Sequence, residues 1–262
     1  MLPQRPLGTT GLHVSALGLG TVKFGRNQGV KYPQHFVLPD DASLRNLLAL
    51  AKDLGINTLD TAPAYGRSEE RLGQLLSHRH DWVIVDKTGE TFSEGQSHFD
   101  FSPAGLRYSL DNSLRQLRTD YIDVLLLHSD GSDLAIIEQG GLDTLLRFKQ
   151  EGKVRAIGMS TKTLEGALAC LEYADVVMLT YHPEHTIESP ALEQCINLHK
   201  GAFIKKALAS GHLGSDAAKV ARENLQFVYQ HPGTSCIIVG TLQAEHLRQN
   251  VQALTYPANN LA

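Results

Sequence analysis

The sequence repeats one pattern eight times, and this repetition limits the possible folds more than any other feature. Each repeat is a short run of β-forming residues, a turn, and a stretch with helical periodicity. The β-like runs span residues 16–22, 56–60, 82–88, 122–128, 154–160, 175–181, 202–206 and 234–240. Several are almost continuously apolar, as parallel strands covered on both faces are. Eight β/α units match a (β/α)8 barrel, whose usual size is about 250 residues.

We therefore predict one α/β domain over residues 1–262, folded as a closed (β/α)8 TIM barrel. An open doubly wound sheet is the alternative, but eight even units without a break in composition favour closure. The turn at Gly8–Gly11 predicts an N-terminal β-hairpin at the barrel bottom. Between the runs, Leu44, Leu47, Leu48 and Ala51 form one apolar helical stripe, and Ser102 before Pro103 is typical of a helix start.

The composition excludes several classes of function. The net charge of −4 gives no general attraction to nucleic acid or to anionic lipid. No apolar run approaches the length of about 18 residues that a membrane span needs. Cys170, Cys195 and Cys236 are scattered without CxxC spacing, which argues against a disulfide framework and a zinc site. We expect a cytoplasmic protein with no metal, no nucleic-acid partner and no membrane partner, whose oligomeric state the sequence leaves open.

Ionisable side chains stand at the ends of consecutive predicted strands, where barrels carry their active sites. Asp60, Lys87 and His128 end three of these strands, and Tyr65 follows in the loop after Asp60. Each alone has an ordinary structural explanation, such as a turn cap, an ion pair or a core histidine. Together they form a set for proton transfer, because a nearby ammonium lowers the pKa of a tyrosine and a carboxylate keeps that ammonium charged. A neutral imidazole can then polarise a carbonyl oxygen.

Several motifs resemble the aldo-keto reductase family, and the resemblance covers nearly the whole chain. They are LDTAPAYGRSEERLG at 59–73, VDKTGE at 85–90, DNSLRQLRTDYIDVLLLH at 111–128, GKVRAIGMS at 152–160 and GTLQAEHLRQN at 240–250. The resemblance implies a barrel enzyme that reduces a small aldehyde or ketone with a nicotinamide, usually NADPH. Asp60, Tyr65, Lys87 and His128 match the catalytic tetrad of the family, with Tyr65 as the general acid.

The same resemblance implies a set of cofactor-binding residues, which departs from the family at several positions. The set consists of Gly20, Thr21, Asp60, Ser160, Thr161, Met178, Lys205, Leu208, Ser210, Gly240, Thr241, His246, Gln249 and Asn250. Thr161 replaces an Asn, Met178 replaces a Gln, and Lys205 replaces an aromatic ring. His246 stands where many members place the Arg that binds the 2′-phosphate, and Gly240 replaces a frequent Lys. NADH therefore stays possible beside NADPH.

Two other functions remain open. A class I aldolase would form a Schiff base at Lys87, Lys205 or Lys206, and a nicotinamide-binding regulatory subunit would bind the cofactor without turnover. Three local patterns receive ordinary interpretations. The Gly18–Gly20 pair lacks the rest of a Rossmann motif, His182–His185 is more typical of pocket lining than of a metal pair, and Ser68–Arg71 predicts an N-cap with a charged first turn.

The length of the chain leaves little room for loops over the barrel mouth. Only the short segment 211–216 follows the seventh predicted strand, and about eight residues follow the last predicted helix. We expect a more open pocket and a less tightly held cofactor than in longer members of the family.

Overall fold

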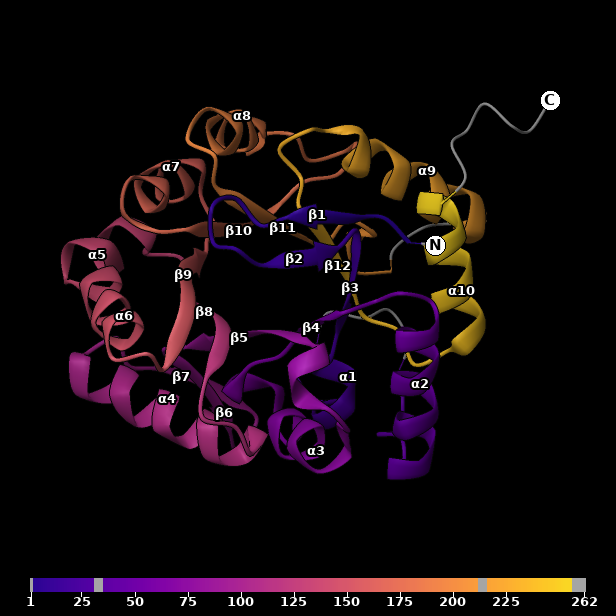
Figure 1. Cartoon of the computed structure of the whole chain (residues 1–262), viewed down its shortest axis with the longest axis horizontal. Coiled ribbons are helices and arrows are strands. Elements are labelled where there is room, and N and C mark those ends of the chain that lie inside the picture. Colours follow the sequence, from indigo (N-terminus) through magenta and orange to yellow (C-terminus); the bar gives the residue numbers. More distant parts are fainter. Residues whose placement is uncertain (1, 31–34, 212–215, 256–262) are drawn as a thin grey trace.

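The computed structural model describes residues 2–30, 35–211 and 216–255, and within them eight parallel strands close into a barrel. Each strand pairs with the next along the chain, and the last pairs with the first (Figure 1). The barrel strands are β3 (Leu17–Gly20), β4 (Thr58–Asp60), β5 (Val83–Thr88), β8 (Ile122–His128), β9 (Val154–Ser160), β10 (Val176–Thr180), β11 (Gly201–Lys205) and β12 (Cys236–Val239). The predicted closed barrel is confirmed, and the observed strands differ from the predicted runs only at their ends.

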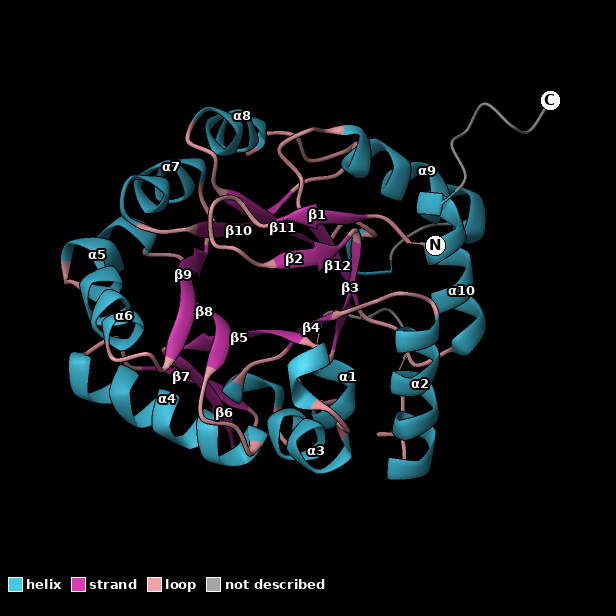
Figure 2. Ribbon diagram, in the orientation of Figure 1, coloured by secondary structure: helices cyan, strands magenta, loops and turns pink. Residues whose placement is uncertain are grey.

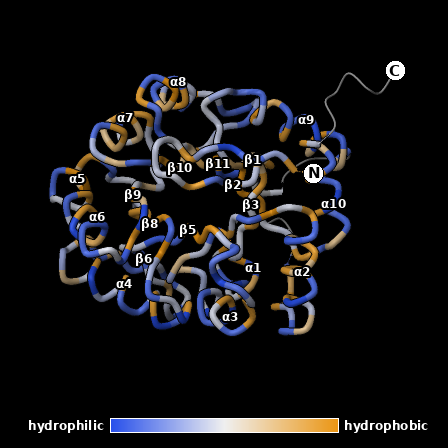
Figure 3. Tube along the Cα trace, in the orientation of Figure 1, coloured by the Kyte–Doolittle hydropathy of each residue, from blue (hydrophilic) through white to orange (hydrophobic). Residues whose placement is uncertain are grey.

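Helices surround the barrel, as Figure 2 shows. They are α2 (Asp41–Asp53), α3 (Ser68–Leu75), α4 (Pro103–Leu117), α5 (Asp133–Glu138), α6 (Gly141–Gln150), α7 (Leu164–Tyr173), α8 (Ser189–Asn197), α9 (Ala217–Gln230) and α10 (Ala244–Thr255). Hydrophobic and hydrophilic segments alternate along their turns (Figure 3), because each helix buries only the stripe that faces the strands. No helix in the described part of the chain is long and apolar enough to cross a membrane.

One predicted apolar stripe and one predicted helix start are confirmed, and a second predicted start is not. The predicted stripe of α2 is buried as expected. The Ser102 side chain accepts a hydrogen bond from the Gly105 N–H at 3.1 Å, with Pro103 as the first helical residue of α4. The prediction for α3 is right in its charged first turn, which holds Glu69 and Glu70, but wrong in its cap. The N-cap is Arg67, and Ser68 already lies inside the helix. The Ser68 hydroxyl instead bonds the Thr21 hydroxyl at 2.7 Å, so a contact across the fold replaces the local cap.

Two small hairpins lie outside the barrel wall. The first pairs β1 (Gln4–Pro6) with β2 (His13–Ser15). Leu7 is fully buried and packs against Gly201, the first residue of β11. A Cβ added to Gly201 would lie 2.4 Å from the Leu7 side chain. Because parallel barrel strands all start at the bottom, this contact confirms the predicted hairpin at the barrel bottom.

The second hairpin pairs β6 (Glu90–Ser93) with β7 (Gln96–Phe99) and was not predicted. It is inserted between β5 and α4, and β6 packs against the short 3-10 helix η1 (Pro63–Tyr65). Its four residues per strand are mostly exposed, so no apolar alternation in the sequence announces it. A single helical turn, α1 (Val22–Gly25), follows β3 directly and shortens the first predicted strand.

Candidate active site

The side chains of the barrel strands alternate between two buried clusters, and this alternation selects which polar residues reach the mouth. On β5, Val83 and Val85 belong to the cluster inside the barrel, whereas Ile84 packs between the strands and the helices. Since successive side chains of a strand point to opposite faces, Lys87 faces the interior and Asp86 faces the helices. The same alternation on the other strands places polar residues at the upper inward positions, among them Asp60, His128, Ser160 and Lys205.

Lys87 and Asp60 form a buried ion pair at the centre of this layer. The Lys87 ammonium contacts Asp60 Oδ1 directly and donates a second hydrogen bond to the backbone oxygen of Thr61 at 2.9 Å. The two residues are only 2% and 4% exposed, so solvent screens their attraction little. Burial opposes the charge of Lys87, but the Asp60 carboxylate and Tyr65 outweigh it and raise the pKa of Lys87 above its ordinary value.

Tyr65 completes a triangle with this pair. It ends η1, the turn that follows β4, and its hydroxyl lies 3.4 Å from Asp60 Oδ2. The Lys87 ammonium lies 4.7 Å from the centre of the Tyr65 ring. Gly66 follows with a φ of +63°, and a Cβ there would lie 2.3 Å from the Gly25 oxygen. The turn that places Tyr65 therefore needs glycine at position 66.

His128 is the fourth member of the group. It ends β8, next to β5, and its ring meets the Tyr65 ring edge-on, with 6.3 Å between the centroids. Its Nδ1 lies 2.8 Å from Glu90 Oε2. Burial lowers the pKa of His128, and the positive charges of Lys87 and Lys205 lower it further, while Glu90 opposes this shift. The predicted tetrad is thus brought together at one end of the barrel.

The first half of the predicted cofactor set also converges, at the ends of β9, β10 and β11. The Lys205 ammonium donates to the Ser160 hydroxyl at 2.9 Å and to the Thr161 backbone oxygen at 2.5 Å. The Thr161 N–H in turn bonds the Met178 oxygen at 3.0 Å. Met178 is 1% exposed and packs inside the barrel, directly opposite Ser160 in the strand register. Lys205 therefore fills the space beside Ser160 with a cation.

The environment of Lys205 disfavours its charge. Burial lowers the pKa of Lys205 to about 7, and the neighbouring Lys206 acts in the same direction, while the carboxylate of Glu188 opposes both. Near neutral pH this amine therefore exists in both protonation states.

Gly20 and Thr21 contact the tetrad through the backbone of Asp60. Gly20 is paired with Asp60 in the register of β3 and β4. Thr21 is fully buried, and its hydroxyl donates to the Asp60 backbone oxygen at 2.8 Å. In the structure Thr21 therefore holds Asp60 in place, and its contact with a cofactor stays a prediction.

The remaining predicted cofactor residues lie on two outer segments. Leu208 follows β11 and is partly buried against the core. Ser210 belongs to the 3-10 helix η3 (Ala209–Gly211), but its side chain lies outside the described residues. At the other segment, Thr241 accepts a hydrogen bond from the Gln243 N–H at 3.1 Å at the start of α10. Gly240 precedes it, His246 and Gln249 are exposed, and Asn250 is buried.

The HPEH segment, His182–His185, does not show the features of a second reactive centre. The His182 and His185 rings stack, with centroids 5.7 Å apart, and their backbones bond each other. Within residues 2–30, 35–211 and 216–255, no group of three or more His, Cys, Asp or Glu side chains is arranged to hold a metal ion.

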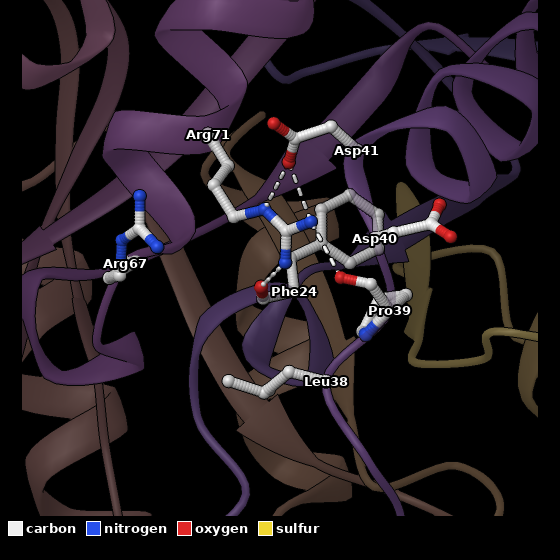
Figure 4. Close-up of a pocket in the computed structure, with 7 residues that line it drawn as sticks. All are labelled: Phe24, Leu38, Pro39, Asp40, Asp41, Arg67 and Arg71. Atoms are coloured by element: carbon white, nitrogen blue, oxygen red, sulfur yellow. Dashed lines mark hydrogen bonds and ion pairs between the residues drawn. The ribbon is translucent and has the colours of Figure 1, made fainter.

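A surface pocket of about 330 Å³ lies beside α2 and α3, and Figure 4 shows its lining. Its central side chain is Arg71, which donates to Asp41 Oδ1 at 2.7 Å and to the backbone oxygens of Phe24 and Pro39 at 2.7 and 2.6 Å. The guanidinium thus ties the loop before α2 to α3, and we interpret the pocket as a structural clamp.

Glu90 is the residue of the site that sequence reasoning missed. Glu90 ends the VDKTGE motif, but the sequence assigns it no role, because its contact with His128 depends on a hairpin that the sequence does not predict. The available signal was a carboxylate three residues after Lys87, separated from its strand by a glycine.

The chain is similar to several known proteins. The sequence model of the aldo/keto reductase family matches residues 16–213. The L-galactose dehydrogenase of Arabidopsis thaliana is 30% identical over 96% of this chain and 88% of its own. The NADH-specific methylglyoxal reductase of Escherichia coli is 30% identical over 72% of this chain and 62% of its own. A Pseudomonas aeruginosa protein solved as an aldo-keto reductase is 50% identical, with a TM-score of 0.87 over 96% of this chain and 93% of its own.

Proposed function

The chain belongs to the aldo/keto reductase family and is an NAD(P)H-dependent oxidoreductase, and from this premise we propose its specific reaction. The enzyme reduces an aldehyde or ketone to an alcohol with hydride from NADPH, and Tyr65 is the general acid. One observation carries the proposal: Tyr65, Asp60 and Lys87 contact one another in a buried group with His128 beside them.

The chemistry follows from the charges in this group. When hydride reaches a carbonyl carbon, negative charge develops on the carbonyl oxygen, which must then take a proton. The Lys87 ammonium beside Tyr65 stabilises the phenolate that remains when the hydroxyl gives up its proton. Asp60 keeps Lys87 charged, so the cation is in place before the reaction starts. Fixed charges of this kind, shielded from water, contribute strongly to transition-state stabilisation.

The residues at the mouth fit a nicotinamide. The Ser160 hydroxyl and the Lys205 ammonium, 2.9 Å apart, offer a polar pair for a carboxamide group. When bound, the reduced nicotinamide supplies the hydride. For NADPH, the support is weaker: Arg248 and His246 are exposed on α10, where we expect them to bind the 2′-phosphate. The NADH-specific relative from Escherichia coli shows that NADH must be tested beside NADPH.

A Schiff-base activity has one candidate residue in this site. The raised pKa of Lys87 and its ion pair with Asp60 make its amine a poor nucleophile. Lys205, whose pKa burial lowers to about 7, retains a nucleophilic fraction. Borohydride treatment in the presence of an aldehyde tests this alternative. A stable adduct at Lys205 without any reductase activity would favour the aldolase.

The proposed function is tested by the loss of reduced-nicotinamide absorbance with a panel of aldehydes and ketones. NADPH and NADH are compared at equal concentrations with the purified full-length protein. We expect turnover with at least one carbonyl and a higher kcat/KM for NADPH. Binding of both cofactors without oxidation by any carbonyl would favour the regulatory subunit. A higher kcat/KM for NADH would overturn the cofactor assignment while leaving the reaction intact.

A further inference from the structure

The carboxylate of Glu90 is held rigidly against the imidazole of His128. Its Oε2 lies 2.8 Å from His128 Nδ1, and the two side chains are only 12% and 19% exposed. Its second oxygen, Oε1, accepts a hydrogen bond from the Ser97 hydroxyl at 2.6 Å. The Ser97 hydrogen bond therefore orients the carboxylate so that Oε2 faces the imidazole nitrogen.

The β6–β7 hairpin is built to aim Glu90 at the barrel mouth. Gly89 turns the chain with a φ of +97°, and a Cβ there would lie 2.4 Å from the Phe101 ring. The Asp100 N–H closes the turn by bonding the Gly89 oxygen at 2.9 Å. A residue with a side chain at position 89, directly before Glu90, would therefore be strained and would clash with the Phe101 ring.

The same hairpin is tied to the loop that carries Tyr65. The Arg26 guanidinium stacks 3.4 Å from the centre of the Phe92 ring in β6. It also donates to the Ala64 backbone oxygen at 3.0 Å, one residue before Tyr65. Glu90 and Tyr65 therefore approach the mouth from two segments that are held together.

The Glu90 contact decides which nitrogen of His128 carries a fixed proton. Burial alone would raise the pKa of Glu90, but the hydrogen bond and the charge of His128, with help from Ser97 and Arg26, lower it to about 2. An ionised carboxylate only accepts hydrogen bonds. At 2.8 Å an ionised carboxylate oxygen would repel a nitrogen lone pair, so a proton on the facing Nδ1 is favoured, and the neutral imidazole then has its lone pair on Nε2.

We propose that Glu90 is a positioning residue that keeps a proton on Nδ1 of His128, so that His128 gains and loses its proton at Nε2, beside the substrate oxygen. The inference rests on the proposed function, because that function brings a carbonyl oxygen to this side of the site. In the imidazolium form, Nε2 also carries a proton and donates a hydrogen bond to a carbonyl. The neutral form, which the sequence suggests as the group that polarises the carbonyl, can then only accept a hydrogen bond at Nε2 from the hydroxyl of an alcohol.

In this arrangement, the pH determines whether the site favours the carbonyl or the alcohol form of the substrate. Carbonyl binding is favoured below the pKa of His128, and alcohol binding is favoured above it. Four titratable groups from the neighbouring elements face the imidazole: Glu90 from β6, Lys87 from β5, Lys205 from β11 and Tyr65 from η1. Burial and the two lysines lower the pKa of His128, and Glu90 raises it, so removal of the Glu90 charge must lower this pKa.

The test is a pH titration of the histidine side chains by ¹⁵N NMR in the cofactor-free, full-length protein. A His128→Asn variant assigns the signal among the 12 histidines. Glu90→Gln keeps a carbonyl acceptor but loses the charge, Glu90→Ala loses both, and Glu94→Gln, at an exposed position of the same hairpin, is the matched control.

We expect wild type, Glu94→Gln and Glu90→Gln to keep the Nδ1–H tautomer, and Glu90→Ala to lose it. We expect the pKa of His128 to fall by about one unit or more in both Glu90 variants, the usual effect of removing a neighbouring opposite charge. An Nε2–H tautomer in wild type, or the same tautomer and pKa in wild type and Glu90→Ala, would overturn the proposal. Because these signals need no turnover, failure here is distinguishable from failure of the reductase assay.

Discussion

At the scale of single residues, the site depends on one buried cation. The Lys87 ammonium contacts Asp60, the Thr61 backbone and the Tyr65 ring, so it fixes the positions of three partners as well as their charges. Its loss would leave the Asp60 carboxylate buried without a counter-ion. A buried charge that loses its partner is far more costly than a broken surface pair.

We therefore predict that Lys87→Met lowers both activity and stability. The free energy of unfolding should fall by about 3–5 kcal/mol, the usual cost of breaking a buried pair. The kcat for carbonyl reduction should fall by about 10²- to 10⁴-fold, the usual contribution of a positioned acid. Urea unfolding and steady-state kinetics measure the two effects. The control is Lys52→Met, which removes a surface pair with Asp81 and should leave both quantities nearly unchanged. A fully active Lys87→Met enzyme would contradict the role of this cation.

Which of these residues the sequence could predict depends on how local their signal is. Asp60, Lys87 and His128 end strands in a fold whose strand ends meet, so their convergence follows from the pattern alone. The contact of Glu90 with His128 and the hydrogen bond of Lys205 to Ser160 depend on three-dimensional packing between distant segments. The hydrogen bond of the Thr21 hydroxyl to the Asp60 backbone oxygen has no local signal in the sequence either, and the contact of Thr21 with a cofactor stays a prediction. Such partners become known only when the chain is folded.

At the scale of elements, the interface between β5 and α3 buries two carboxyl groups. Asp86 is fully buried on the helix-facing side of β5, and Glu69 on α3 is 3% exposed. Burial and the negative charge of Asp86 raise the pKa of Glu69 well above its ordinary value, and burial raises the pKa of Asp86 to about 6. The folded protein therefore holds protons that the unfolded chain releases near pH 4.

This pair predicts a specific pH dependence of stability. The contribution of the protonated pair to the free energy of unfolding is fully present below about pH 4. It is lost as the pH rises through the raised pKa values of the folded protein, because folding in this range takes up protons. We predict that Glu69→Gln, whose amide stays neutral, shows a smaller loss of unfolding free energy between about pH 4 and pH 8. Urea unfolding at a series of pH values measures it, with Glu172→Gln, at an exposed position of α7, as control. Parallel pH profiles for wild type and Glu69→Gln would show that the pair does not titrate in this way.

Elements with strong periodicity were predictable, and short exposed elements were not. The stripe of α2 and the cap of α4 are set by the residues within each helix. The β6–β7 hairpin has no apolar face of its own, and α3 starts without the local cap that its sequence suggests. In both cases contacts with other segments decide the structure, and a single-sequence pattern does not contain them.

At the scale of the whole molecule, the apolar core and the ionisable site occupy different levels along the barrel axis. Apolar side chains such as Leu7, Val124 and Phe203 fill the interior, and the ionisable group occupies the mouth. The connection from β11 to α9 covers only residues 206–216, so this side of the mouth has little chain to enclose a bound cofactor.

We accordingly predict that NADPH binds with a micromolar dissociation constant. A short connection buries less of a bound dinucleotide, and affinity that is not supplied by enclosure must come from a few polar contacts. Fluorescence titration of the full-length protein measures the constant, and NADH serves as the comparison ligand. A nanomolar constant for NADPH would show that the mouth encloses the cofactor more completely than this account states.

The central claim is that Tyr65 gives the proton to the substrate oxygen, supported by Lys87 and Asp60. The most direct measurement is the kcat of Tyr65→Phe for an aldehyde that the wild type reduces, with cofactor binding checked separately. Tyr108→Phe is the matched control, because Tyr108 is 74% exposed on α4. We predict a loss of about 10²- to 10⁴-fold in kcat for Tyr65→Phe, unchanged binding of the reduced cofactor, and full activity for Tyr108→Phe. Full activity of Tyr65→Phe would contradict the account.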